Sequence, residues 1–172
     1  MTTNRQNGSL YTKIQNRIAT IEFGHPASNS FPSELLDRLT TELNSVSNNN
    51  DVSVVVLKSE GNKAFCAGAS FDELVAIDNL ESGKQFFSGF ANVINAMRTC
   101  SKLIIGRVQG KTVGGGVGLA AACDYVLATE AASIKLSELT IGIGPFVIAP
   151  AVKRKVGVSG LAELTLDATS WK

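Results

Sequence analysis

The chain has 172 residues, enough to bury one hydrophobic core, and its length predicts a single domain over residues 1–172. Its 16 basic and 15 acidic side chains nearly cancel, so the charge indicates no nucleic-acid partner and no membrane surface. No apolar run approaches the roughly 20 residues that span a bilayer, and the first ten residues lack the apolar core of a secretory signal. We therefore expect a cytoplasmic protein.

Histidine and cysteine usage restricts the possible chemistry. Cys66, Cys100 and Cys123 lie far apart and form no C-x-x-C pair, which favours reduced thiols over a disulfide framework. The single histidine, His25, excludes a multi-histidine metal site, and its turn-like surroundings predict a loop residue. We expect no metal and no resident cofactor.

Strand and helix patterns alternate along the chain. Polar and apolar residues alternate over residues 11–23 on both sides of Asn16 and Arg17, which predicts a β-hairpin. Leucines at helical spacing after Pro32 predict an amphipathic helix, and a β-branched run predicts a buried strand. That strand covers residues 52–59; further helices are expected from residue 71, over 83–100 and over 117–124, and further strands over 102–110, 125–129 and 133–137. This order predicts an α/β chain with a largely parallel sheet and with ligand sites in the loops that follow the strands.

Glycine is concentrated in the segment "GKTVGGGVGLAAACDY", residues 110–125. A phosphate loop of the Walker type would need G-x-x-x-x-G-K-[ST], and the spacing from Gly106 to Gly110 is one residue too short. A dinucleotide-binding turn could use Gly116 and Gly118 with Glu138 as the acidic residue, although the helix that follows ends near residue 124. Close helix–strand packing without any ligand is a further interpretation.

An oxyanion site fits the same segment. An apolar strand ends, glycines expose backbone N–H groups, and a helix begins directly behind them, so its free amides and its dipole point at the same place. A second loop of this kind, "GNKAFCAGASFDEL", follows the buried strand at residues 52–59, and a helix begins near Phe71. Each loop could donate one N–H to a single carbonyl oxygen.

Together, "GNKAFCAGASFDEL" and "VQGKTVGGGVGLAAACDYVLATEAASIKLSELTIGIGP" resemble the crotonase superfamily, the enoyl-CoA hydratases and isomerases. The resemblance implies the ClpP/crotonase fold, a spiral of β-β-α units, and an acyl-CoA thioester as the substrate. It implies that the amides of Ala69 and Gly115 hold the thioester carbonyl. The residues implied to contact coenzyme A, which is part of the substrate, are Ala67, Gly68, Ala69, Gly114 and Gly115, with the adenine near Ala67 and the pantetheine arm between the two loops.

The resemblance also bears on acid–base chemistry. Family hydratases use two glutamates, and the matching positions here are Gly118 and Glu138. One carboxylate suits the shift of a 3-enoyl bond to the 2-position, with Glu138 as the catalytic acid and base, in fatty acid metabolism. Hydration, for example of a branched enoyl-CoA, and non-catalytic binding of a CoA thioester stay open as alternatives.

The end of the chain departs from the family pattern. "IGIGPFVIAP" replaces a glycine-rich segment found in many relatives, so Pro145, Phe146 and Ile148 are expected to shape the acyl end of the pocket. Relatives continue into helices that cover this pocket and build trimers. We expect this C-terminal helical part to be missing here, and the full-length form to be a homo-oligomer, a trimer or a dimer of trimers.

Overall fold

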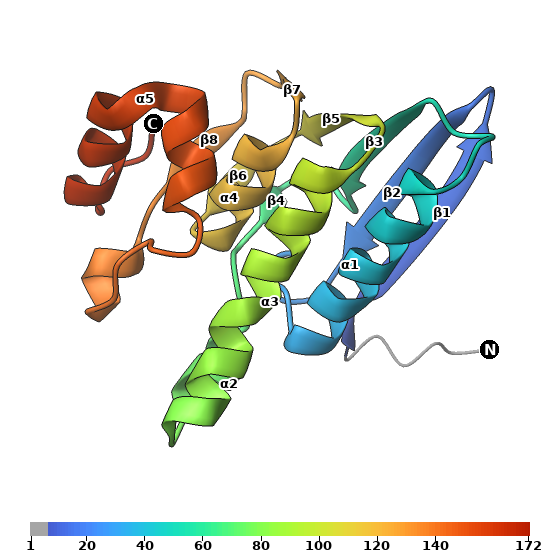
Figure 1. Cartoon of the computed structure of the whole chain (residues 1–172). Helices are drawn as coiled ribbons and strands as arrows, with labels where there is room; N and C mark the ends of the chain where they lie inside the picture. Colours follow the sequence, from blue (N-terminus) through green and yellow to red (C-terminus); the bar gives the residue numbers. More distant parts are fainter. Residues whose placement is uncertain (1–6) are drawn as a thin grey trace.

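The computed structural model, which describes residues 7–172, contains a five-stranded sheet with β1 and β2 at one side of the molecule (Figure 1). Its strand order is β1-β2-β3-β5-β7, with β1 antiparallel to β2 and every other pair parallel. These strands are β1 (Ser9–Gln15), β2 (Ile18–Gly24), β3 (Val54–Ser59), β5 (Leu103–Val108) and β7 (Tyr125–Ala128).

The predicted hairpin is confirmed. Asn16 and Arg17 connect β1 to β2 with φ values of 52° and 62°, the conformation of a two-residue turn whose twist matches that of the strands. One face of β2 points into the core, where Ala19, Ile21 and Phe23 have no exposed surface. The alternation of apolar and polar residues that predicted the hairpin therefore separates a buried face from a more solvent-exposed face.

A second, three-stranded sheet positions the two glycine loops and Glu138. It consists of β4 (Ala64–Cys66), β6 (Lys111–Val113) and β8 (Ser133–Lys135), all parallel and in the order β4-β6-β8. The expectation of strands near residues 133–137 is confirmed, whereas β4, β6 and the division into two sheets were not predicted. Three-residue strands beside glycines are too short to show a hydrophobic period.

Each strand of the small sheet directly follows a strand of the large one. The pairs β3–β4, β5–β6 and β7–β8 are each followed by helical chain, which gives the repeated β-β-α units that the family resemblance implies. The helical elements are α1 (Ser33–Ser47), α2 (Phe71–Val75), α3 (Leu80–Thr99), α4 (Gly115–Ala122), the 3₁₀ helix η2 (Glu138–Ile141) and α5 (Ala149–Leu166). None of the helices within residues 7–172 combines the length and the apolar character that crossing a bilayer requires.

The helices α1 and α3 pack together over one face of the large sheet (Figure 1). The apolar stripe of α1 is fully buried, and it consists of Leu35, Leu36, Leu39, Leu43 and Val46. Pro32 caps this helix without a side-chain acceptor, so Glu73 of α2 accepts the Ser33 N–H instead, at 2.9 Å. Helix α3 begins three residues earlier than predicted, because Asn79 forms a capping box with Ser82.

The connection from β2 to α1 holds the chain on both sides of β4 in place through hydrogen bonds. Asn29, which is 7% exposed, donates from Nδ2 to the carbonyls of Glu60 and Ala64, both at 2.9 Å, and its Oδ1 accepts the His25 N–H. The Ala67 N–H donates to the Ser28 carbonyl at 3.2 Å. The chain on both sides of β4 is therefore fixed by a segment more than 30 residues earlier in the sequence.

Replacement of Asn29 by alanine tests whether its side-chain hydrogen bonds stabilise the fold. The Asn29→Ala variant leaves the Glu60 carbonyl without its amide donor and removes one of the donors to the Ala64 carbonyl, which keeps Gln109 Nε2 at 3.2 Å. Alanine must also adopt a φ of 58°, so we expect a loss of about 3 kcal/mol in unfolding free energy. Urea unfolding followed by circular dichroism measures it. The control is Asn48→Ala, which removes an exposed side chain bonded only within its own helix end and should change the free energy by no more than about 0.5 kcal/mol. Equal urea midpoints for the two variants would contradict this role of Asn29.

Candidate active site

Two loops meet at the carboxyl edge of the small sheet. Since β4 and β6 are parallel neighbours, the residues after Cys66 and after Val113 emerge side by side. A Cβ atom at Gly68 would lie 3.2 Å from the Val113 carbonyl oxygen and 3.5 Å from the Gly115 nitrogen. Gly68 also has a φ of 90°, which favours glycine. The structure therefore brings together the two loops that the sequence analysis paired.

Phe31 fixes the side of the chain on which the Ala69 amide lies. Phe31 donates its N–H to the Gly68 carbonyl at 2.8 Å and accepts the Ser70 N–H at 2.9 Å, as an isolated parallel bridge to Ala69. In extended chain, consecutive N–H groups point to opposite sides, so the Ala69 N–H is directed away from Phe31. No residue within 7–172 accepts a hydrogen bond from it.

Gly115 supplies the second amide. It is the first residue of α4, where a backbone N–H has no acceptor inside the helix and where the helix dipole favours negative charge. Gly114 precedes it with φ 51° and ψ −119°, a conformation suited to glycine, and donates its own N–H to the Lys135 carbonyl at 3.0 Å. The Gly115 N–H, like that of Ala69, has no acceptor in the described part of the chain.

Glu138 lies over these glycines. It begins η2, which follows β8 after two residues. Because β8 pairs with β6, the same sheet edge presents Glu138 beside Gly114. A Cβ atom at Gly114 would lie 3.1 Å from Glu138 Oε1. Glu138 Oε2 is buried and has no hydrogen-bond partner among residues 7–172. Burial raises the pKa of the Glu138 carboxyl above its ordinary value, and a bond from its own backbone N–H offsets only part of this rise.

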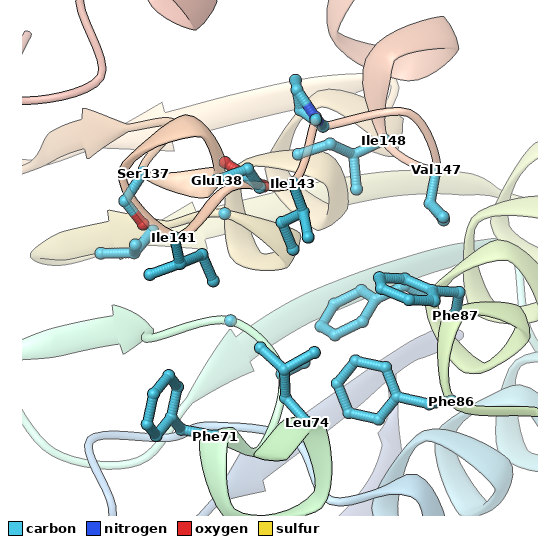
Figure 2. A pocket seen from close by; sticks show the side chains of 18 of the residues that line it. Phe71, Leu74, Phe86, Phe87, Ser137, Glu138, Ile141, Ile143, Val147 and Ile148 are labelled. Carbon is cyan, nitrogen blue, oxygen red and sulfur yellow. The ribbon is translucent and has the colours of Figure 1, made fainter. Parts of the chain in front are cut away.

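A cavity of about 190 Å³ joins these groups. In Figure 2, Phe71, Leu74, Phe86 and Phe87 of α2 and α3 face Glu138 and the apolar side chains of the segment after it. The cavity walls also contain the two glycine loops. Every residue that the family resemblance implies for catalysis or for coenzyme A binding is among them: Ala67, Gly68, Ala69, Gly114, Gly115 and Glu138. Among residues 7–172, Glu138 is the only titratable side chain in the lining.

The position matching the first hydratase glutamate, Gly118, has no room for a side chain. Gly118 is buried inside α4, and a Cβ atom there would collide with the side chain of Ile148 and lie 3.3 Å from Ile94 Cδ1. Ile148 is 3% exposed and lines the cavity together with Pro145, as expected. The expectation for Phe146 is wrong, because its ring is 82% exposed and lies outside the lining.

Thiol chemistry does not fit this site. Cys66 lies behind Gly116, where an added Cβ atom would be 2.7 Å from the Cys66 Cβ, and its thiol is fully buried. Burial raises the pKa of the Cys66 thiol to about 12, so little thiolate exists at neutral pH. Within residues 7–172 no group of three or more histidine, cysteine, aspartate or glutamate side chains is placed to hold a metal ion.

The aromatic and aliphatic wall of the cavity was not predicted from the sequence. Phe86, Phe90 and Ile143 come from two segments that share no motif, and each reads in the sequence as an ordinary core residue. The helical spacing of residues 86 and 90 predicts a common face, but it does not show that this face borders a cavity.

The chain has the crotonase fold. Its β-β-α units form a spiral, and two glycine loops with unpaired backbone N–H groups meet a carboxylate at one sheet edge. The chain belongs to the enoyl-CoA hydratase/isomerase family, whose model matches residues 13–172. YngF of Bacillus subtilis, described as an enoyl-CoA hydratase/isomerase, is 32% identical over 139 residues, which are 79% of this chain and 52% of YngF. The short-chain-enoyl-CoA hydratase of Clostridium acetobutylicum is 28% identical over 160 residues, which are 92% of this chain and 61% of that enzyme.

Solved structures show the same fold. A Legionella pneumophila protein described as an enoyl-CoA hydratase/isomerase (crotonase) superimposes with a TM-score of 0.89 at 30% sequence identity, over 96% of this chain and 64% of that one. The chain therefore spans between 52% and 64% of the length of these three relatives.

The raised pKa of Glu138 predicts a pH-dependent stability. The folded state holds the Glu138 proton more tightly than the unfolded state, so the wild-type chain loses unfolding free energy as pH rises from the ordinary glutamate pKa of 4.5 through the raised one. The Glu138→Gln variant has no such titration. We expect its urea midpoint, relative to wild type, to rise between about pH 4 and about pH 8. The exposed Glu130→Gln variant is the control and should show no such trend, and a Glu138→Gln difference that falls with pH would contradict the assignment.

Proposed function

We propose that this chain acts on acyl-CoA thioesters and moves a double bond from the 3-position to the 2-position of the acyl group. The observation that carries the proposal is the setting of Glu138, whose buried Oε2 has no hydrogen-bond partner within residues 7–172. Among these residues it is the only titratable side chain in the lining of a cavity that also holds two unpaired backbone amides. Family membership supports the acyl-CoA thioester as the substrate class.

The two amides stabilise charge on the thioester oxygen. In the proposed complex this oxygen accepts hydrogen bonds from the N–H groups of Ala69 and Gly115. Proton removal from C2 moves negative charge onto that oxygen, and a single N–H donor to such an oxyanion contributes roughly 3 to 4 kcal/mol. The apolar cavity strengthens this effect because little water competes for the oxygen.

Glu138 moves the proton. Its carboxylate takes a proton from C2 of the 3-enoyl thioester, which leaves a dienolate delocalised from the carbonyl oxygen to C4. The carboxylic acid then returns the same proton to C4, and the double bond remains between C2 and C3. The reaction consumes no water and needs no second acid or base, and the raised pKa of Glu138 favours the return of the proton.

Hydration is the second candidate, and the name of the Clostridium acetobutylicum relative favours it. Addition of water to a double bond calls for a group that orients the water and another that supplies a proton to the α-carbon. In this chain Ile148 fills the space beside Gly118 where a second carboxylate would stand. Because Ile148 fills the space beside Gly118, the structure favours isomerisation over hydration. If the chain only bound the thioester without catalysis, Glu138 would be dispensable.

Substitution of Glu138 separates these functions. Turnover of 3-hexenoyl-CoA by the Glu138→Gln variant should fall by at least about 100-fold, because general acid–base catalysis contributes 10²- to 10⁴-fold. Rates on 3-hexenoyl-CoA and on 2-hexenoyl-CoA are compared for wild type, Glu138→Gln and the exposed control Glu130→Gln. Hydration faster than isomerisation in the wild type would favour the hydratase, and full activity of Glu138→Gln on both substrates would remove the role of Glu138.

A further inference from the structure

The two proposed oxyanion donors belong to different β-β-α units, so their separation must be set by contacts between those units. Phe31, which lies in neither loop, holds the first donor. Its backbone N–H and carbonyl bond to Gly68 and Ser70, the residues on either side of Ala69, at 2.8 and 2.9 Å. These two hydrogen bonds fix the position of the Ala69 amide relative to the backbone of Phe31.

Phe90 of α3 holds the second donor. Its ring lies directly against the backbone of Gly115, where a Cβ atom would be 2.5 Å from Cζ, 2.6 Å from Cε1 and 2.7 Å from Cε2. The ring therefore occupies the space that any larger residue would need at position 115. Phe90 is only 6% exposed, so it has little freedom to move away.

The rings of these two residues touch each other. Phe31 and Phe90 pack edge to face, with centroids 5.9 Å apart and an interplanar angle of 71°. Behind them, Phe23 of β2 packs against Phe31 with centroids 4.8 Å apart, which supports the pair from the large sheet. Phe31 has no exposed surface. A continuous line of contacts thus runs from the Ala69 amide through Phe31 and Phe90 to Gly115.

We propose that Phe31 and Phe90 are positioning residues that set the separation of the Ala69 and Gly115 amides, so that both donate to one carbonyl oxygen. The proposal rests on the proposed function, because it takes these amides to hold the thioester. The aromatic pair is suited to this task because rigid rings in a close-packed interior transmit position, whereas a leucine in place of either ring leaves space into which a loop can relax.

Polarisation of a bound thioester reports the two amides directly. Butyryl-CoA carrying ¹³C at the thioester carbonyl has no double bond to isomerise, and isotope-edited infrared spectroscopy follows its carbonyl stretch. In the wild-type chain we expect the band to shift to lower wavenumber on binding. In Phe90→Leu and Phe31→Leu it should return at least halfway to its position in solution, and turnover of 3-hexenoyl-CoA should fall about tenfold with little change in KM.

Two features make the comparison specific. Phe90 lines the cavity, but Phe31 does not, so an effect of Phe31→Leu on the carbonyl band cannot come from a lost contact with the acyl chain. Phe23→Leu makes the same substitution in the same aromatic cluster without touching Gly115 or the cavity. It should lower the thermal midpoint as much as the other two variants while it leaves most of the band shift in place.

The outcomes separate the inference from the proposed function. A wild-type chain that does not bind butyryl-CoA, or binds it with no band shift, overturns the proposed function and this inference with it. A wild-type shift that persists fully in Phe31→Leu and Phe90→Leu overturns the inference alone. Equal losses of the shift in all three variants also overturn it, because the effect would then belong to general loosening of the aromatic cluster.

Discussion

Parallel pairing of β4, β6 and β8 is the constraint on which the arrangement of the candidate site depends. The strands have three residues each, yet their common direction places three separate stretches of chain at one edge. These stretches carry Ala69, Gly115 and Glu138, which are far apart in the sequence. In an antiparallel arrangement alternate strand ends would lie at opposite edges, so the three groups could not meet.

Close packing explains why small residues are needed beside that edge. Gly68 lies against the backbone at Val113, Gly115 against the ring of Phe90, and Gly116 against Cys66. A side chain at any of these positions would have to displace a backbone or buried groups, and the loops would separate. These glycines are therefore both a packing requirement and the reason that backbone N–H groups border the cavity. The packing interpretation and the oxyanion interpretation describe the same feature.

The environment of Glu138 results from opposing effects. Removal of a carboxylate from water is unfavourable, and Oε2 receives no compensating hydrogen bond within residues 7–172. The cost is expressed as a raised pKa, so the protonated form is favoured more than in an exposed glutamate. A protein that needed only a stable fold would gain from an apolar residue here. In the proposed function, the substrate supplies the partner that Oε2 lacks within residues 7–172.

The sequence predicts several elements of the fold and the two loops of the candidate site, but not the second sheet or the packing around the glycines. The hairpin, the first helix and the pairing of the two glycine loops follow from local period, turn residues and two motifs that span the site. The second sheet could not be predicted, because strands as short as β4 show no alternation. The contact of Phe90 with Gly115 and the filling of the Gly118 position by Ile148 depend on tertiary packing between distant segments, which no local pattern encodes.

A crystal structure of the chain with bound butyryl-CoA tests the central claim most directly, because it shows which groups contact the thioester oxygen. We expect this oxygen to lie within hydrogen-bonding distance, roughly 2.7 to 3.2 Å, of the backbone nitrogens of both Ala69 and Gly115, with the Glu138 carboxylate beside C2. A thioester oxygen bonded to neither amide, or an acyl group bound outside the cavity, would contradict it.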